Sequence, residues 1–283
     1  MKNSDINIRD PFVLTEGGKY YLYGTRARDF GCRVGGFDVY VGDDLENWSD
    51  PIPVFDSAPF GMNDECNWAP EVHKYNGKYY AFVTFRQKNG RRGTYSLVSD
   101  SPVGPFVPNS EGPLTPEEWF SLDGTLWVED GKPYLVFCHE HVQITNGTVC
   151  RVELTPDLKR PAGEPEVLFY GSEAYGVPRN EENHYVPDGP FLYRGQNDRL
   201  YLIWSTCPPE GYYQGLCVSE SGSVKGPWKQ VPPLYTKDGG HGMLFRDLNG
   251  GLRLTLHSPN ASGYEHPVFF RVSDNGERLD ICD

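Results

Sequence analysis

Apolar and polar positions along the chain repeat one plan five times. Each copy opens with a short polar stretch and a Gly or Pro, runs on as an apolar segment, turns at a polar or glycine-rich signal, and returns as an aromatic-rich segment. Two such runs joined by a tight polar turn indicate a β-hairpin. The copies read DPFVLTEGGKYYLYGT from Asp10, APEVHKYNGKYYAFVTF from Ala69, DGTLWVEDGKPYLVFCHE from Asp123, DGPFLYRGQNDRLYLIWST from Asp188 and HGMLFRDLNGGLRLTLHS from His241.

The intervals between these hairpins hold further strand-like segments, at 94–99, 148–154, 216–219 and 267–272. Each copy therefore has room for about four strands, which is the content of one propeller blade. The pattern predicts an all-β fold, a five-bladed β-propeller. Because no stretch of linker-like composition divides the chain, we expect residues 1–283 to form a single domain. A β-sandwich or a β-helix with accidental internal similarity is the alternative.

Composition narrows the classes of partner. The chain has 39 acidic and 26 basic residues and a net charge of −13. Such a chain lacks the basic surplus that binds phosphates or anionic lipids, so we expect neither a nucleic-acid nor a membrane partner. The seven cysteines form no Cys-x-x-Cys pair, and the N-terminal residues lack the apolar core of a signal peptide. These features predict reduced thiols and a cytoplasmic protein.

The repeat has a consequence for charged residues. The first strand of each propeller blade lines the central channel, so equivalent positions of the copies converge on the axis. We place Asp10, Ala69, Asp123, Asp188 and His241 at those positions. Neighbouring carboxylates raise one another's pKa, and a cluster with one protonated and one ionised group is typical of acid–base catalysis. The alternative is that each Asp before Gly or Pro only forms a turn.

These residues lie in motifs that resemble those of glycoside hydrolase family 43. The motifs are Arg9-Asp10-Pro11-Phe12, Trp68-Ala69-Pro70-Glu71, Leu122-Asp123-Gly124, Asp188-Gly189-Pro190-Phe191 and the turn Gly240-His241-Gly242. The resemblance covers about residues 6–273. It implies an inverting glycosidase of the arabinofuranosidase and xylosidase type on a five-bladed propeller. It also implies that Asp10 is the general base and that Asp123 orients the acid and raises its pKa.

The acid is where the sequence departs from the family. The family's acid is a glutamate of a Glu-Gly-Pro motif in the fourth blade, and Asp188 stands there in this chain. The aspartate is one methylene shorter, and a misplacement of about 1 Å can cost on the order of a hundredfold in rate. Three explanations remain open. Asp188 is the acid in a pocket rebuilt around it, the acid is another residue such as Glu140 or Glu173, or the protein binds sugars without hydrolysing them.

Sugar contacts are expected from aromatic faces and planar polar groups near the channel mouth. Trp68 is the candidate stacking wall, and Phe30, Trp119 and Phe120 lie in nearby loops. We expect further substrate contacts from Glu71, Glu140, His257 and Arg271, and for each the alternative is core packing or a structural hydrogen bond. In relatives the histidine at the position of His241 helps to hold an axial water or a calcium ion.

The sequence as a whole predicts a glycoside hydrolase that acts on short arabinose- or xylose-containing oligosaccharides and requires no cofactor, with a structural calcium ion as an open question. The rival hypothesis is a carbohydrate-binding propeller without catalysis. The sequence leaves open the sugar, the linkage, exo or endo action, and the oligomeric state.

Overall fold

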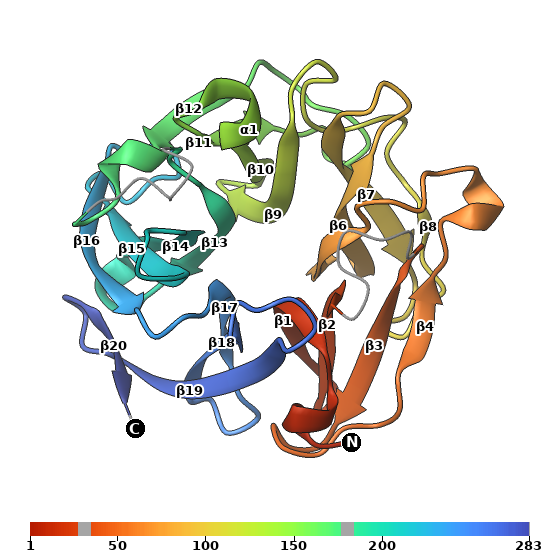
Figure 1. The fold of residues 1–283 in the computed structure, drawn as a ribbon, viewed down its shortest axis with the longest axis horizontal. Helices are drawn as coiled ribbons and strands as arrows, with labels where there is room; N and C mark the ends of the chain where they lie inside the picture. The colour runs from red at the N-terminus through yellow and green to blue at the C-terminus, as the bar shows by residue number, and fades with distance from the viewer. Residues whose placement is uncertain (28–34, 177–183, 283) are drawn as a thin grey trace.

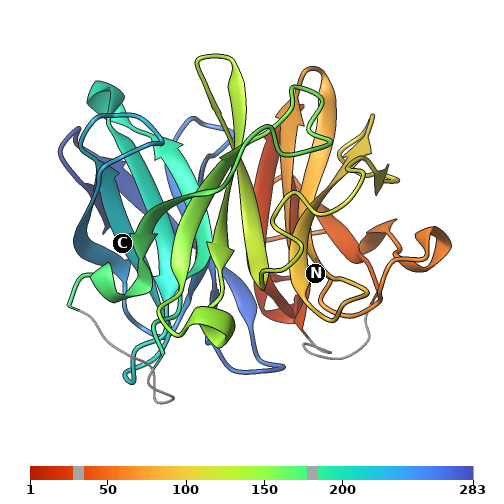
Figure 2. The same cartoon turned by 90° about the horizontal axis from the view of Figure 1, so that it is seen from above.

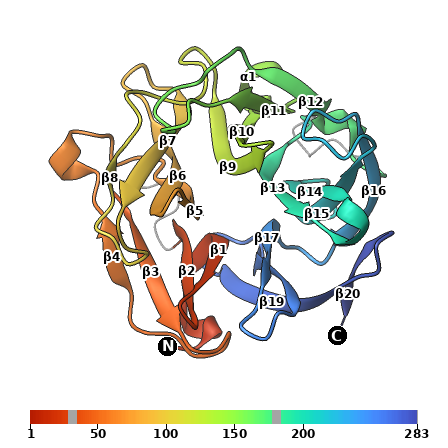
Figure 3. The same cartoon turned by 180° about the vertical axis from the view of Figure 1, so that it is seen from behind.

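The computed structural model describes residues 1–27, 35–176 and 184–282. Its described residues form five antiparallel sheets of four strands each, arranged around a central axis as a five-bladed propeller (Figure 1). The predicted fold class is confirmed. Each blade is built from one continuous stretch of chain; the N-terminus lies near the junction of blades I and V, whereas the C-terminus lies at the outer edge of blade V (Figures 1 and 3).

The blades follow the sequence repeats, innermost strand first. Blade I holds β1 (Ile8–Glu16), β2 (Lys19–Arg26), β3 (Phe37–Gly42) and β4 (Ile52–Phe55), and blade II holds β5 (Trp68–Tyr75), β6 (Lys78–Arg86), β7 (Arg92–Ser99) and β8 (Val107–Pro108). Blade III holds β9 (Ser121–Glu129), β10 (Lys132–His139), β11 (Thr148–Glu153) and β12 (Glu166–Tyr170). Blade IV holds β13 (Asp188–Arg194), β14 (Leu200–Thr206), β15 (Tyr213–Ser219) and β16 (Trp228–Tyr235), and blade V holds β17 (Gly240–Arg246), β18 (Leu252–Ser258), β19 (His266–Asp274) and β20 (Leu279–Cys282).

Helical structure in the described residues is limited to single turns. They are η1 (Asn3–Asp5), η3 (Ala58–Phe60), α1 (His141–Ile144), η4 (Gly171–Glu173) and η5 (Gln196–Asp198). None of the helices in the described part of the chain has the length and apolar composition that a membrane span needs. Seen from the side, the strands of all blades run along the axis, so the connecting loops gather at its two ends (Figure 2).

The hydrophobic core lies between neighbouring blades rather than in one central mass. Four buried clusters join blades I, II and V, blades II and III, blades III and IV, and blades IV and V. The axis itself is closed by aromatic side chains of the innermost strands. The Phe12 ring lies 5.1 Å from the His73 ring and 6.3 Å from the Phe191 ring, so blades I, II and IV meet there.

Side chains, rather than a shared strand, hold blade V against blade I. Arg9 Nη1 lies 2.8 Å from Glu265 Oε1, Asn7 donates to the Glu265 carbonyl at 2.8 Å, and the Trp48 and Phe269 rings stack at 6.0 Å. Glu265 is fully buried. The junction between the first and last blades therefore contains a buried ion pair next to the start of β1.

Candidate active site

The innermost strand of every blade carries one irregularity near its start. The pairing with the second strand shifts register there, and the residue inside the shift has a positive φ in all five blades. This residue is Asp10 (φ 55°), Ala69 (47°), Asp123 (56°), Gly189 (45°) and His241 (48°). The left-handed conformation costs an L-residue roughly 1–2 kcal/mol, so four of these five positions store strain where the side chains converge.

Blade IV corrects the predicted alignment by one residue. The position equivalent to Asp10 is Gly189, and Asp188 is equivalent to Arg9. A Cβ atom at Gly189 would lie 2.6 Å from the His241 ring, so only glycine leaves that ring its place on the axis. Asp188 approaches the cluster from the preceding position, and its carboxylate still reaches His241.

A second repeated contact holds these backbones in place. In four of the five blades, the end of the second strand carries an acceptor for the axial N–H group of the following blade: Thr25 for Ala69 at 2.7 Å, Thr84 for Asp123 at 3.0 Å, Ser205 for His241 at 2.7 Å, and His257 for Asp10 at 3.1 Å. Cys138 occupies this place in blade III. A thiol is a weak acceptor, and the Gly189 N–H group donates instead to Asp123 Oδ2 at 3.2 Å.

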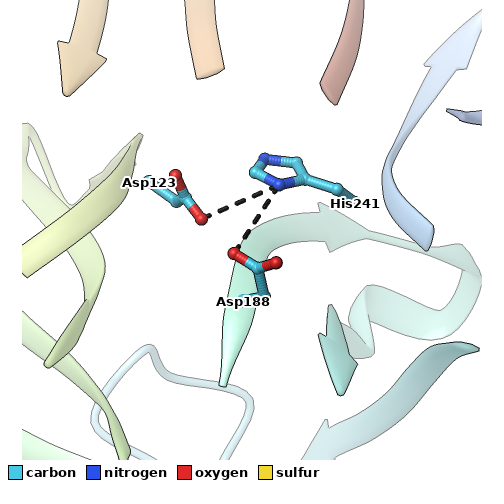
Figure 4. A group of neighbouring side chains, drawn as sticks. All are labelled: Asp123, Asp188 and His241. Atoms are coloured by element: carbon cyan, nitrogen blue, oxygen red, sulfur yellow. Dashed lines mark ion pairs between the residues drawn. The ribbon is translucent and has the colours of Figure 1, made fainter. Parts of the chain in front are cut away.

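Three carboxylates surround the imidazole of His241. Its Nδ1 atom lies 3.2 Å from Asp10 Oδ1, 3.7 Å from Asp123 Oδ2 and 3.8 Å from Asp188 Oδ1 (Figure 4 draws the last two). Asp10, Asp123 and His241 are buried, whereas the Asp188 side chain keeps 23% of its surface exposed. Asp188 is therefore the carboxylate of this cluster that is most open to a bound molecule.

Asp123 and Asp188 share one proton. Burial raises the pKa of Asp123 well above the usual carboxyl range, and the charge of Asp188 raises it further. Burial also acts to raise the pKa of Asp188, but hydrogen bonding to Asp123, the nearby His241 and the Tyr212 hydroxyl outweigh it and lower that pKa to about 2. The pair therefore holds a proton on Asp123 and a negative charge on Asp188.

Asp10 is held differently. The Thr25 hydroxyl donates to Asp10 Oδ2 at 2.6 Å, and the Asp10 N–H group donates to His257 Nδ1. His257 Nε2 then carries the ring hydrogen and donates to Asn260 Oδ1 at 3.3 Å. Burial lowers the pKa of His257 to about 4, so the ring is neutral near neutral pH. Asp10 thus has one carboxylate oxygen fixed by a hydroxyl and the other near His241.

A flat wall of stacked groups stands beside this cluster. The Arg92 guanidinium lies 5.3 Å from the centre of the Trp68 ring and 5.1 Å from that of the Phe120 ring. Its Nε and Nη2 atoms donate to the two oxygens of Glu140 at 2.6 and 2.5 Å. Trp68 directly precedes the axial residue Ala69, and Glu140 follows Cys138, which pairs with Leu122 beside Asp123, so the wall lies next to the cluster. The structure thereby brings together, around Arg92, three residues named from the sequence: Trp68, Phe120 and Glu140.

Comparison with known proteins identifies the arrangement. The sequence model described as Glycosyl hydrolases family 43 matches residues 5–268. The chain belongs to glycosyl hydrolase family 43. The family resemblance inferred from the motifs is confirmed, and membership implies no organic cofactor.

Solved and curated members of the family resemble the chain to different extents. The crystal structure of an endo-arabinase from Bacteroides thetaiotaomicron VPI-5482 is 36% identical in sequence, with a TM-score of 0.89 over 98% of both chains. The arabinoxylan arabinofuranohydrolase of Bacillus subtilis (strain 168) is 28% identical over 252 residues, which cover 66% of this chain and 49% of that protein. Xylosidase/arabinosidase 43A of Humicola insolens is 29% identical over 148 residues, 47% of this chain and 44% of that protein. The chain thus spans less than half the length of these curated relatives.

Two of the substrate contacts expected of this family 43 chain are corrected by the structure. Arg271 pairs with Arg253 on β18, near the hairpin turn at the far end of blade V, because β18 and β19 run antiparallel away from the cluster. His257 lies at the cluster but is fully buried, so it accepts the Asp10 N–H group instead of meeting a sugar hydroxyl.

The remaining candidates have packing partners. Glu71 is buried, and its carboxylate lies 2.9 Å from His73 Nε2 on the ring that packs against Phe12. The Trp119 ring stacks on His139 at 4.1 Å. Glu173 accepts the N–H group of Tyr170 at the start of η4, and its side chain is exposed. Phe30 lies outside the described residues.

Two residues that touch the cluster directly, Thr25 and Tyr212, were not among those predicted from the sequence. The Tyr212 hydroxyl donates to Asp188 Oδ2 at 2.6 Å, and burial, followed by the charge of Asp188, raises the pKa of Tyr212 well above its usual value. Tyr212 lies in the loop between β14 and β15, outside every repeated motif. A tyrosine in so aromatic a chain carries no sequence signal that distinguishes it from a core residue.

Proposed function

We propose that this chain is a glycoside hydrolase that cleaves arabinose-containing oligosaccharides with inversion at the anomeric carbon. The observation that supports this most directly is the convergence of Asp10 and the Asp123–Asp188 pair on one nitrogen atom of His241. It provides an ionised carboxylate on one side and a shared proton on the other. Inverting hydrolysis needs these two groups.

On one side of the sugar, Asp10 acts as general base. The hydrogen bond from Thr25 fixes its Oδ2 atom, and Oδ1 takes a proton from the attacking water. The oxygen of that water forms the new bond to the anomeric carbon while the bond to the leaving oxygen breaks. Asp10 Oδ1 and Asp188 Oδ1 lie 3.2 Å and 3.8 Å from His241 Nδ1, so the two oxygens are at most about 7 Å apart. This upper limit overlaps the lower end of the ~6.5–9.5 Å separation between the two carboxyl groups of inverting enzymes.

On the other side, the proton shared by Asp123 and Asp188 goes to the leaving oxygen. Asp188 is the more exposed of the two, so it is the group that faces the substrate. As the glycosidic oxygen gains negative charge, the proton passes from Asp123 to Asp188 and on to that oxygen. The cycle ends with Asp10 protonated and the pair fully ionised, and exchange with solvent restores the starting state.

Arabinose is the proposed sugar because of the relatives. The endo-arabinase structure is 36% identical over almost the whole chain, and the curated relatives include arabinofuranosidases and xylosidase/arabinosidases. Xylose-containing oligosaccharides are the second choice. The Trp68–Arg92–Phe120 wall offers aromatic faces and a fixed carboxylate, Glu140, for a sugar ring and its hydroxyl groups.

A calcium ion fits the described donors poorly. Asp123, Asp188 and His241 each offer one ligand atom, within 4.8 Å of one another. Calcium takes six to eight oxygen ligands, and this set contributes only two carboxylates and one nitrogen atom. We therefore propose that His241 acts through hydrogen bonds, with an axial water as its partner, and that hydrolysis survives treatment with a chelator.

One observation favours the rival function, a carbohydrate-binding propeller without catalysis. Asp188 is ionised, and Tyr212 stabilises that charge, so Asp188 alone has no proton to give. A hydrolase requires transfer of the proton from Asp123 to Asp188, whereas a carbohydrate-binding protein requires no proton transfer. The two readings make opposite predictions about turnover, and the experiment below separates them.

For its setting, we propose a reducing compartment and no nucleic-acid or membrane partner. In the described part of the chain, Cys66, Cys138, Cys150 and Cys217 are buried free thiols. The net charge of −13 disfavours adsorption to anionic surfaces.

The test is a hydrolysis screen on aryl glycosides and short oligosaccharides of arabinofuranose, xylopyranose and galactopyranose. Wild type is compared with Asp10→Asn, Asp188→Asn, Glu140→Gln and the exposed control Glu173→Gln. We expect turnover in the wild type and Glu173→Gln and losses on the order of a thousandfold or more in the two aspartate variants. Binding of oligosaccharides without turnover by the wild type would establish the binding propeller. Turnover that survives Asp188→Asn but not Glu140→Gln would make Glu140 the acid.

A further inference from the structure

Three loops at one end of the propeller come together around Tyr212. Its backbone N–H group donates to Asp238 Oδ1 at 3.3 Å, and its carbonyl accepts the Gly239 N–H group at 2.8 Å. A Cβ atom at Gly240 would lie 2.6 Å from the Tyr212 ring, so glycine there leaves space for the ring. Tyr212 is only 3% exposed, so it is held on all sides and has little contact with solvent or substrate.

The Tyr212 ring stacks on a second ring, His257, which holds the backbone of Asp10 and lies 3.6 Å from its Oδ1 atom. The rings of Tyr212 and His257 lie 5.5 Å apart with an interplanar angle of 19°. Tyr212 binds Asp188, and His257 accepts the Asp10 N–H group. A chain of hydrogen bonds also joins the two residues: Asp238, which binds the Tyr212 N–H group, accepts the Asn260 N–H group through Oδ2 at 3.2 Å, and Asn260 accepts a hydrogen bond from His257.

We propose that Tyr212 and His257 form one positioning unit that fixes the orientation of Asp188 relative to Asp10 across the cleavage site. The unit rests on the proposed function, since only a reaction with a proton donor and a base on opposite faces of a sugar requires a fixed distance between them. Both rings are buried, so Tyr212 acts through the Asp188 carboxylate and His257 through the backbone of Asp10.

The shorter side chain of Asp188 is the reason why its orientation must be fixed. A carboxylate whose side chain is one methylene shorter must be oriented accurately toward the leaving oxygen, because a misplacement of about 1 Å can lower the rate on the order of a hundredfold. Asp188 Oδ2 accepts a hydrogen bond from the Tyr212 hydroxyl, which leaves Oδ1 facing His241. Without that hydrogen bond, the Asp188 carboxylate, of which 23% is exposed, would be less restrained in its rotation about its last bond.

Tyr212→Phe tests the unit, because it keeps the stacked ring and removes a single oxygen atom. The matched control is Tyr213→Phe, which removes the neighbouring hydroxyl, whose hydrogen bond goes to the Tyr175 carbonyl at 3.3 Å. Each variant is assayed on a series of aryl arabinofuranosides whose leaving groups range from dinitrophenol to methylphenol, and on the natural oligosaccharide. Thermal unfolding of each variant shows whether the fold is intact.

A positioning role predicts a loss that depends on the leaving group. We expect kcat/KM of Tyr212→Phe to fall about ten- to hundredfold on the poor leaving groups and less than about threefold on dinitrophenol, which needs little proton assistance. Tyr213→Phe should behave as wild type throughout. An equal loss on every leaving group, or none, would overturn the proposal.

A double-mutant cycle gives an independent reading that does not depend on small changes in stability. If Tyr212 acts through Asp188, then Tyr212→Phe has no further effect once Asp188→Asn is present. Losses that simply multiply would contradict the proposal. A wild type that hydrolyses no member of the series would instead reject the proposed function, so the two failures remain distinguishable.

Discussion

The neutral, buried His257 makes the stability of the fold depend on pH. Burial lowers the pKa of this ring from the ordinary 6.5 to about 4. As pH falls through 6.5, the unfolded chain binds a proton on His257 but the folded chain does not. The unfolded state is therefore favoured progressively between pH 6.5 and 4. One pKa unit corresponds to 1.36 kcal/mol, so the loss reaches about 3 kcal/mol by pH 4 and about 2.5 kcal/mol by pH 4.5.

The variant His257→Gln isolates this contribution. Glutamine does not titrate, and its side-chain carbonyl can still accept the Asp10 N–H group. Urea unfolding at several pH values between 7.5 and 4.5 measures the free energy of unfolding for wild type and variant. Carboxyl groups titrate in both proteins, so their contribution cancels in the difference. We expect the wild type to lose about 2.5 kcal/mol more than His257→Gln over this range.

The matched control is His266→Gln at the same junction of blades I and V. His266 donates from Nδ1 to the Ile6 carbonyl at 2.8 Å, so its removal perturbs the junction without touching the carboxylate cluster. This variant should keep the wild-type difference between pH 7.5 and 4.5. Equal pH dependence in wild type and His257→Gln would refute the argument that a neutral imidazole holds the backbone of Asp10.

Two further predictions concern buried ion pairs. Glu265→Gln removes the buried carboxylate that pairs with Arg9 and should lower the free energy of unfolding by about 3 kcal/mol in urea, whereas Asp43→Asn, at an exposed pair, should leave it almost unchanged. Similar values for both would show that the junction of the blades does not depend on its ion pair. Arg92→Lys cannot form both hydrogen bonds to Glu140, and it should raise KM for oligosaccharides about tenfold with little change in kcat; a loss confined to kcat would contradict the assignment of this wall to sugar binding.

The fold could be predicted from the sequence because its determinants are local. Each hairpin carries its own turn residues and its own alternation, and five copies in register leave few architectures other than a propeller. The axial positions Asp10, Asp123 and His241 followed from the same register. Asp188 was misplaced by one residue because Asp-Gly-Pro fits the repeat with either residue on the axis, and the choice depends on the His241 ring from another blade.

The side chains that contact one another across blades could not be predicted. Tyr212 reaches Asp188 only because three loops far apart in sequence close around it. Arg271 and His257 have similar chemistry for a sugar site, and only the direction of their strands decides that one lies at the cluster and the other at the far end. Which carboxylate of the pair keeps the proton depends on burial and on hydrogen bonds that no motif records.

The most direct test of the account is proton NMR of a linear arabino-oligosaccharide during hydrolysis by wild type and by Asp10→Asn. Wild type should release a product whose first-formed anomer is opposite to that of the cleaved bond, because water attacks directly from the side of Asp10. Asp10→Asn should bind the oligosaccharide with similar affinity and hydrolyse it on the order of a thousandfold more slowly or not at all. A product of retained configuration, or hydrolysis undiminished in Asp10→Asn, would contradict the central claim that Asp10 activates water opposite a proton shared by Asp123 and Asp188.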